Sequence, residues 1–222
     1  MIVNAIIFDF DGVLLESEYE SNRHLAELLT ELGHPTGVED ALTHYSGLSG
    51  RDFIAAIEAR IGARLTPEFH ERRGVEDARA LRDGLAAVAG AVEFVRSLPP
   101  DLPRAVASSS SVQWIGTHLD HLGLRDSFGD HLYSGAEHVR RGKPAPDLYL
   151  HAARQLGVPI AGCTIIEDSP VGARGALASG GRVVGLIAGS HCLTGHDERL
   201  QAIGIEEIAD SFADVRRLLG LG

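Results

Sequence analysis

Short apolar runs alternate along the chain with longer segments in which apolar residues recur every three or four positions. Residues 2–8 form the first run, and their β-branched side chains are typical of a strand buried on both faces of a parallel sheet. Similar runs predict strands at 104–108, 131–134, 164–167 and 182–186, and a less regular run predicts one at 204–208. Helical spacing predicts helices at 89–98, 112–122, 147–156, 171–179 and 212–219. This alternation indicates an α/β fold, with helices layered on a parallel sheet.

The segment between the first two predicted strands has a different pattern. Residues 17–32 and 51–61 show helical spacing, the polar segment 67–81 is predicted to be helical too, and nothing between 16 and 82 resembles a buried strand. We therefore predict a parallel-sheet core formed by residues 1–15 and 85–222, with an all-helical insertion formed by residues 16–84. A chain of 222 residues is long enough for both parts.

The charge balance argues against two classes of partner. With 20 basic and 31 acidic residues the net charge is −11, so we expect no nucleic-acid and no membrane partner. No apolar stretch approaches the length of a membrane span. Cys163 and Cys192 are the only cysteines, which favours reduced thiols in a cytoplasmic protein. We expect a monomer or a weak homodimer.

Carboxylates follow the first strand at the point where the apolar run ends. Asp9 and Asp11 are one residue apart, and Gly12 comes directly after them. Burying an unpaired carboxylate is costly unless it is neutralised or bound to a cation. The sequence therefore predicts a positive group beside this pair.

Polar clusters also follow two later strands. Ser108 begins a run of four serines, Glu167 and Asp168 end the 164–167 strand, and Lys143 lies between these two stretches. Ligands of open parallel sheets bind beyond the carboxyl ends of the strands, so we expect these groups to converge on one crevice. Several carboxylates in such a crevice favour Mg²⁺, which prefers oxygen ligands and bridges to phosphate.

Four motifs carry a resemblance to a known family. The stretch Asp9-Phe10-Asp11-Gly12-Val13, then Ser108, Lys143 and the pair Glu167-Asp168, in this order, resemble the motifs of the haloacid dehalogenase superfamily. The helical insertion resembles the cap of its β-phosphoglucomutase-like phosphatase branch, as do the stretches 142–147 and 166–173. The resemblance covers essentially the whole chain. It implies a Rossmann-like core, a mobile cap and a phosphoaspartyl intermediate.

The resemblance also implies catalytic roles. Asp9 would be the nucleophile, and Asp11 the general acid for the leaving alcohol and then the base that activates water. These tasks require one ionised and one protonated carboxyl group, which neighbouring carboxylates can provide because their pKa values are pushed apart. Ser108 would hold phosphoryl oxygens and Lys143 would screen Asp9 from the approaching dianion.

Metal and substrate contacts follow from the same resemblance. Mg²⁺ would be held by Asp9, by the backbone carbonyl of Asp11 and by Asp168, with Glu167 as a further or water-mediated ligand. Gly12 and Ser109 would contact the phosphoryl group. In the insertion, residues 47–52 occupy the place of the specificity loop in related caps, and Arg51 is a candidate fork for a second anionic group on the substrate.

We therefore predict a Mg²⁺-dependent phosphatase acting on a small phosphorylated metabolite, a sugar or sugar-acid phosphate similar to 6-phosphogluconate. A phosphosugar mutase is an alternative, although Ser21 stands where β-phosphoglucomutases have a histidine. A dehalogenase is disfavoured because those enzymes lack the second aspartate, Asp11. A receiver-type signalling domain is a second alternative, distinguished by a long-lived phosphoaspartate without ester turnover.

One further cluster contains candidate metal ligands and is interpreted separately. His191, Cys192 and His196 are soft-metal ligands by type, but no second cysteine pair completes a tetrahedral set. The sequence alone therefore favours an ordinary loop there.

Overall fold

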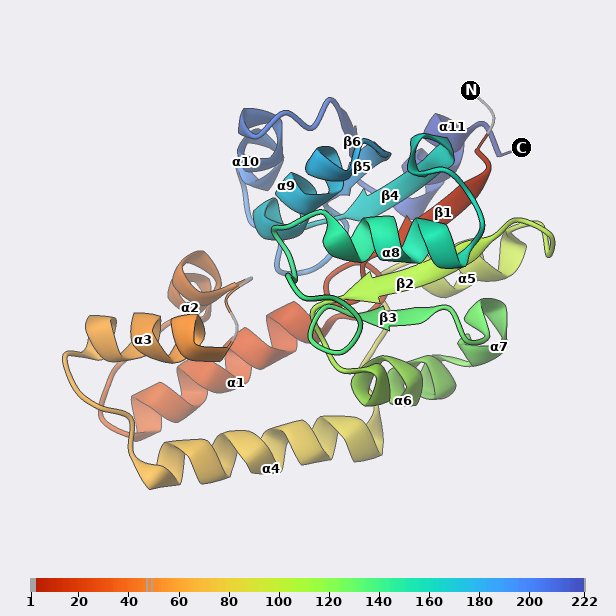
Figure 1. The fold of residues 1–222 in the computed structure, drawn as a ribbon. Helices are drawn as coiled ribbons and strands as arrows, with labels where there is room; N and C mark the ends of the chain where they lie inside the picture. Colours follow the sequence, from red (N-terminus) through yellow and green to blue (C-terminus); the bar gives the residue numbers. More distant parts are fainter. Residues whose placement is uncertain (1–2, 47, 49, 222) are drawn as a thin grey trace.

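A computed structural model describes residues 3–46, 48 and 50–221, and its centre is a parallel sheet (Figure 1). The strands are β1 (Ala5–Phe8), β2 (Arg104–Ser108), β3 (Leu132–Ser134), β4 (Cys163–Glu167), β5 (Arg182–Leu186) and β6 (Glu207–Ala209). They run in the order β3-β2-β1-β4-β5-β6, and each neighbouring pair is parallel. The predicted α/β fold is confirmed. Central β1 lies between β2 and β4, with Phe8 beside Val106 and Ile166.

Helices cover both faces of this sheet, which explains why its strands are apolar throughout. One face packs against α5 (Ala91–Ser97), α6 (Val112–Leu122), α7 (Arg125–Phe128) and α11 (Phe212–Leu219). The other packs against α8 (Asp147–Gln155), α9 (Pro170–Ser179) and α10 (His196–Ala202), and a short 3-10 helix, Ile160–Gly162, precedes β4. Along β1, Ile6 and Phe8 face the first group and Ala5 and Ile7 face the second.

A separate group of helices lies at one end of the sheet, coloured from red-orange to yellow in Figure 1. It comprises α1 (Ser17–Glu31), α2 (Val38–Tyr45), α3 (Gly50–Ile61) and α4 (Pro67–Asp83). These helices share a hydrophobic core of their own, to which Leu29, Ile57 and Phe69 contribute. We call residues 16–84 the cap; its helical character is as expected, and its exact boundaries stay a prediction.

The two chain segments that join the cap to the sheet run beside each other. The backbone N–H of Glu16 donates to the carbonyl of Ala86, at 2.9 Å, and the N–H of Val88 donates to the carbonyl of Leu14, at 3.1 Å. The cap is therefore connected to the core by a pair of hydrogen-bonded segments close to the end of β1.

Most predicted elements lie within a few residues of the observed ones. The expected strand at 204–208 is placed wrongly, because Gly204 has φ +102° in the turn after α10 and β6 begins only at Glu207. Three short helices were not predicted: α2, α7 and α10. Across the described ranges, no helix combines the length and the apolar character that a membrane span requires.

Candidate active site

Three charged side chains meet beyond the carboxyl ends of β1 and β4. Lys143 Nζ lies 2.7 Å from Asp9 Oδ1 and 2.6 Å from Glu167 Oε1. All three side chains are buried, with exposed fractions of 4%, 8% and 0%. The structure thus brings residues 9, 143 and 167 into one ion-pair network, where the sequence analysis expected a crevice.

Burial dominates the electrostatics of this network. It raises the pKa of Asp9 well above its ordinary value, and the negative charge of Glu167 raises it further while Lys143 opposes the rise. Burial alone would lower the pKa of Lys143, but the two carboxylates outweigh it and raise that pKa. Burial would likewise raise the pKa of Glu167, yet Lys143 and nearby hydrogen-bond donors bring it below its usual range. Lys143 is therefore charged, and Glu167 is its firmly ionised partner.

Glu167 uses both of its carboxylate oxygens. Oε1 accepts from Lys143 Nζ and from the Tyr149 hydroxyl, each at 2.6 Å. Oε2 accepts from the backbone N–H groups of Asp168 and Ser169, and from the Ser169 hydroxyl. Gly172 makes room for it, since a Cβ there would lie 1.7 Å from Oε1. Hydrogen-bond donors to both oxygens thus hold the Glu167 carboxylate in place.

Asp168 is held differently, by two histidines that the sequence analysis did not place here. Its Oδ2 lies 2.8 Å from His191 Nε2, and its backbone carbonyl lies 2.6 Å from His196 Nε2. Its Oδ1 is buried and has no hydrogen-bond partner among the described residues. Gly12, at φ +84°, packs against this carboxylate; a Cβ there would lie 2.3 Å from Oδ2. Glycine at position 12 is therefore required by close approach.

These carboxylates meet the chemical requirements of a hard divalent cation. One oxygen each from Asp9, Glu167 and Asp168 lie within 4.8 Å of one another, and all three residues are buried. Burial raises the pKa of Asp168 well above its ordinary value, and the negative charge of Glu167 adds to the rise. Because Lys143 compensates only part of this charge and Asp168 Oδ1 is unpartnered, Mg²⁺ fits the cluster.

The side chains that donate hydrogen bonds to Asp11 are neutral. Its Oδ1 accepts from the Ser17 hydroxyl at 2.7 Å and from Trp114 Nε1 at 3.1 Å. Its Oδ2 accepts from the hydroxyls of Ser108 at 3.0 Å and Ser110 at 2.6 Å. The contacts of Trp114 and Ser110 were not predicted, although both follow β2 closely in the sequence.

A cavity of about 400 Å³ opens between these groups and the cap. The core wall of this cavity comprises Asp9, Asp11, Leu85, Ser108, Ser109, Ser110, Trp114, Lys143, Asp168, Ser169 and Val171. The cap wall, drawn from α1, α4 and the segments beside them, includes Ser17, Glu18, Glu20, Ser21, Arg23, His24, Leu48, Arg73, Glu76, Asp77, Arg79 and Asp83. Of the predicted substrate contacts, Ser109 lies in the core wall, whereas Gly12 lies behind it.

The cap wall carries three guanidinium groups in different surroundings. Arg23 pairs with two glutamates of its own helix, at 2.8 and 2.7 Å, and Arg79 has two acidic neighbours at 3.7 Å. Arg73 donates to the carbonyl and hydroxyl of Ser21, at 3.3 and 3.0 Å, and has no carboxylate within ion-pair distance in the described part of the chain. Arg51, the predicted fork, is exposed in the first turn of α3 and outside the cavity lining.

Comparison with known proteins places the chain among related sequences. Residues 3–180 match the model of the haloacid dehalogenase-like hydrolases. The 6-phosphogluconate phosphatase of Escherichia coli is 28% identical, over 85% of each chain. The fructose-1-phosphate phosphatase YqaB of the same organism is 30% identical, over 79% of this chain and 92% of its own.

A solved structure shows the same likeness. A haloacid dehalogenase family hydrolase from Deinococcus radiodurans, with bound phosphate and sodium, superposes with a TM-score of 0.83 at 31% identity. The superposition covers 98% of this chain and 95% of that one.

Proposed function

The chain belongs to the haloacid dehalogenase-like hydrolases, and we propose that it is a Mg²⁺-dependent phosphatase of a small sugar or sugar-acid phosphate, acting through a phosphoaspartyl intermediate. One observation carries the proposal: Asp9, buried against Lys143, faces a cavity that also holds Asp11, Ser108 and Asp168. Such a cavity offers a nucleophile, a proton carrier, hydroxyl donors and a cation site within one small volume.

In the first step, a carboxylate oxygen of Asp9 attacks phosphorus in line with the ester bond. The Asp9 oxygen–phosphorus bond forms, the ester oxygen–phosphorus bond breaks, and the leaving alcohol takes a proton from Asp11. In the second step, Asp11 removes a proton from water, which attacks phosphorus and releases inorganic phosphate and free Asp9. Both aspartates line the same cavity wall, as this sequence of steps requires.

Charge on the transferring phosphoryl group must be compensated from the core wall. Lys143 supplies one positive charge, and Ser108 and Ser109 supply donors. When bound, Mg²⁺ would supply the remaining charge, held by Asp9, Asp168 and the carbonyl of Asp11. Since both oxygens of Glu167 already accept hydrogen bonds, we assign it a water-mediated or orienting role.

The substrate class rests on the relatives and on the cavity. Two relatives are named for sugar or sugar-acid phosphates, and about 400 Å³ suits a leaving group of that size. The cap wall offers charged and hydroxyl side chains, which suit the hydroxyl groups of a sugar. Arg73 in the cavity and Arg51 beyond it are the candidate contacts for a second acidic group.

Membership of a hydrolase family disfavours the receiver-type alternative. For the mutase alternative, Ser21 does line the cavity, but its hydroxyl accepts a hydrogen bond from Arg73 and has no basic nitrogen to take up a proton.

The proposal is tested by turnover of a substrate panel. Purified protein with Mg²⁺ is offered 6-phosphogluconate, fructose 1-phosphate and hexitol phosphates, and inorganic phosphate is measured. We expect release without a bisphosphate primer, and loss of that release in Asp9→Asn. Primer-dependent isomerisation without phosphate release, or equal turnover by the variant, would overturn the proposal.

A further inference from the structure

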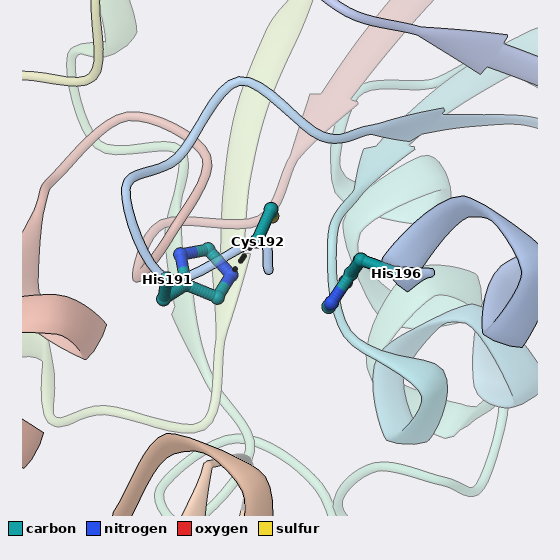
Figure 2. Close-up of side chains that lie close together, drawn as sticks. All are labelled: His191, Cys192 and His196. Carbon is teal, nitrogen blue, oxygen red and sulfur yellow. Dashed lines mark hydrogen bonds between the residues drawn. The ribbon is translucent and has the colours of Figure 1, made fainter. Parts of the chain in front are cut away.

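Three side chains with soft-metal donor atoms lie together behind the candidate active site. His191 and Cys192 belong to the segment between β5 and α10, and His196 begins α10. Figure 2 shows His191 and Cys192 side by side, with the ring of His196 directed toward them from its helix. One ring nitrogen of each histidine and the sulfur of Cys192 lie within 4.8 Å of one another. The sequence alone favours an ordinary loop here, because no second cysteine pair completes a tetrahedral set of ligands.

A candidate fourth donor, Asp168, lies beside His191 directly after β4. Asp168 Oδ2 lies 2.8 Å from His191 Nε2, and the same nitrogen lies 3.4 Å from Cys192 Sγ. The ring of His196 reaches the backbone of Asp168 at 2.6 Å. Asp168 therefore places a carboxylate oxygen beside one of the two imidazoles, although it is 23 residues from the nearest of the others.

The two histidines of this cluster are buried and Cys192 is half-buried. The side chains of His191 and Asp168 are each 3% exposed. The segment is fastened by backbone bonds from Cys192 N–H to Gly189 carbonyl, at 2.9 Å, and from His196 N–H to Leu193 carbonyl, at 3.0 Å. His191 Nδ1 is buried and has no hydrogen-bond partner among the described residues. This nitrogen packs against Gly189, whereas Nε2, on the other side of the ring, faces Cys192 and Asp168.

We propose that His191, Cys192 and His196 bind Zn²⁺ or another thiophilic divalent ion, with the Asp168 carboxylate as the fourth donor. Two nitrogens, one sulfur and one oxygen make a ligand set suited to tetrahedral Zn²⁺, whereas Mg²⁺ prefers oxygen alone. On binding, the Cys192 thiol releases its proton to solvent and the thiolate takes a coordination position. Donor atoms in a tetrahedral zinc site are about 3.3–3.8 Å apart. The His191–Cys192 pair already has this spacing, at 3.4 Å, whereas His191 Nε2 and Asp168 Oδ2, at 2.8 Å, must move apart.

The position of this site gives it a consequence for catalysis. Asp168 is also a ligand of Mg²⁺ in the proposed function, on which this step of the argument rests. A thiophilic ion that occupies the Asp168 carboxylate competes with Mg²⁺ for it and lowers turnover. The ligand set thus makes the phosphatase sensitive to a second class of metal.

Cobalt tests the site directly, because a thiolate bound to Co²⁺ gives an intense near-ultraviolet charge-transfer band and a carboxylate does not. The reduced, metal-free chain is titrated with Co²⁺ in excess Mg²⁺. We expect this band, together with the visible bands of tetrahedral Co²⁺, at one ion per chain. One equivalent of Zn²⁺ should displace the bound Co²⁺ and abolish these bands. Absence of the thiolate band would overturn the site, whatever the phosphatase assay shows.

Matched variants identify the sulfur. Cys192→Ser should lose the charge-transfer band and bind Zn²⁺ at least about 100-fold more weakly, since loss of a direct ligand exceeds the loss of an outer partner. Cys163→Ser, at the other thiol, should keep both. Thermal unfolding and Mg²⁺-dependent turnover without Zn²⁺ verify that each variant is folded, and Cys192→Ala serves as a second variant. An unchanged band in folded Cys192→Ser or Cys192→Ala would refute the assignment.

Inhibition tests the shared carboxylate separately. In excess Mg²⁺, Zn²⁺ should inhibit the parent chain at concentrations at least tenfold lower than those that inhibit Cys192→Ser. Equal inhibition of both would show that Zn²⁺ acts only at the Asp9 cluster, and would overturn the sharing of Asp168. If the protein hydrolyses no phosphate ester, the proposed function fails, while the cobalt spectrum still decides the metal site.

Discussion

The two walls of the cavity differ in how deeply their charged side chains are buried. On the core wall, the charges of Asp9 and Lys143 are 8% and 4% exposed and are fixed by the ends of strands and by one another. On the cap wall, Arg23 and Arg79 are 34% and 59% exposed and are tied to carboxylates of their own helices. Charges interact far more strongly in a buried, low-dielectric setting than at a hydrated surface.

This difference indicates a division of labour. The core wall can stabilise a change of charge at phosphorus without reorganising, because its groups are already in place. The cap wall has adjustable side chains around a polar volume, which suits selection of the leaving group. Variants on the two walls should therefore differ in size of effect and in the kinetic constant that changes.

The largest effect is expected from Asp9→Asn, which removes the nucleophile and retains the shape of the side chain. We expect kcat to fall by about four orders of magnitude or more, because the covalent step is lost. Steady-state release of inorganic phosphate measures the change. Asp83→Asn, on the cap wall of the same cavity, is the matched control and should change kcat less than about tenfold. Comparable losses in the two variants would erase the distinction between the walls.

Lys143→Ala should have the next largest effect. Loss of a preorganised charge beside the transferring phosphoryl group costs about 3–4 kcal/mol, which is a fall in kcat of two to three orders of magnitude. Arg79→Ala removes a charge of the same sign from the cap wall and should alter kcat less than about threefold. Unchanged kcat in folded Lys143→Ala would remove this lysine from the site.

The response of Mg²⁺ binding to pH tests the buried carboxylates as a group. Burial raises the pKa of Asp9 and Asp168 above the values of the unfolded chain. As pH rises from the ordinary carboxyl pKa through the raised values, the metal-free folded chain keeps protons that the unfolded chain has lost. The contribution of these groups to stability therefore falls across that window. Above that pH window, Mg²⁺ binds the ionised carboxylates and offsets the lost stability.

Thermal unfolding with and without Mg²⁺ measures this effect. At a concentration 100-fold above its dissociation constant at pH 8, Mg²⁺ should raise Tm by about 5 °C or more at that pH, and the same concentration should raise Tm by much less at pH 5. NaCl at matched ionic strength is the control. A larger rise at pH 5 than at pH 8 would contradict the pKa directions.

The smallest effects should come from the cap arginines. Arg73→Ala should raise KM about tenfold for a substrate with a second acidic group, with kcat kept, because Arg73 has no carboxylate partner in the described part of the chain. The matched substrates are 6-phosphogluconate and glucitol 6-phosphate, which differ in a carboxylate. Arg51→Ala tests the predicted fork, and we expect a smaller rise because Arg51 lies outside the cavity lining. Equal KM changes for the two substrates would exclude a carboxylate contact by either arginine.

The core wall was largely predictable because parallel strands end at one edge of a sheet. Asp9, Ser108 and Glu167 each follow an apolar run, so their meeting follows from topology, and the family resemblance added the roles. What could not be predicted comes from irregular segments. The contacts of His191 and His196 with Asp168 join a loop and a short helix to β4 across more than 20 residues.

The helices of the cap could be predicted from the sequence, but the side chains that face the cavity could not. Periodicity indicated α1 and α3, because their apolar positions face a shared core. It did not indicate that Arg73 turns toward the cavity while Arg51 stays outside, since polar positions on a helix carry no periodic signal for their partners. Trp114 illustrates the same limit on the core side, because its indole N–H bonds to a carboxylate 103 residues away.

The account depends on transfer of the phosphoryl group to Asp9, and chemical trapping of that adduct tests it most directly. The chain is mixed with Mg²⁺ and the best panel substrate, quenched within one turnover and reduced with borohydride, which converts an aspartyl phosphate to homoserine. Peptide mass spectrometry should find homoserine at position 9, and none in Asp9→Asn. Reduction at another carboxylate, or full substrate turnover with position 9 never phosphorylated, would contradict the account.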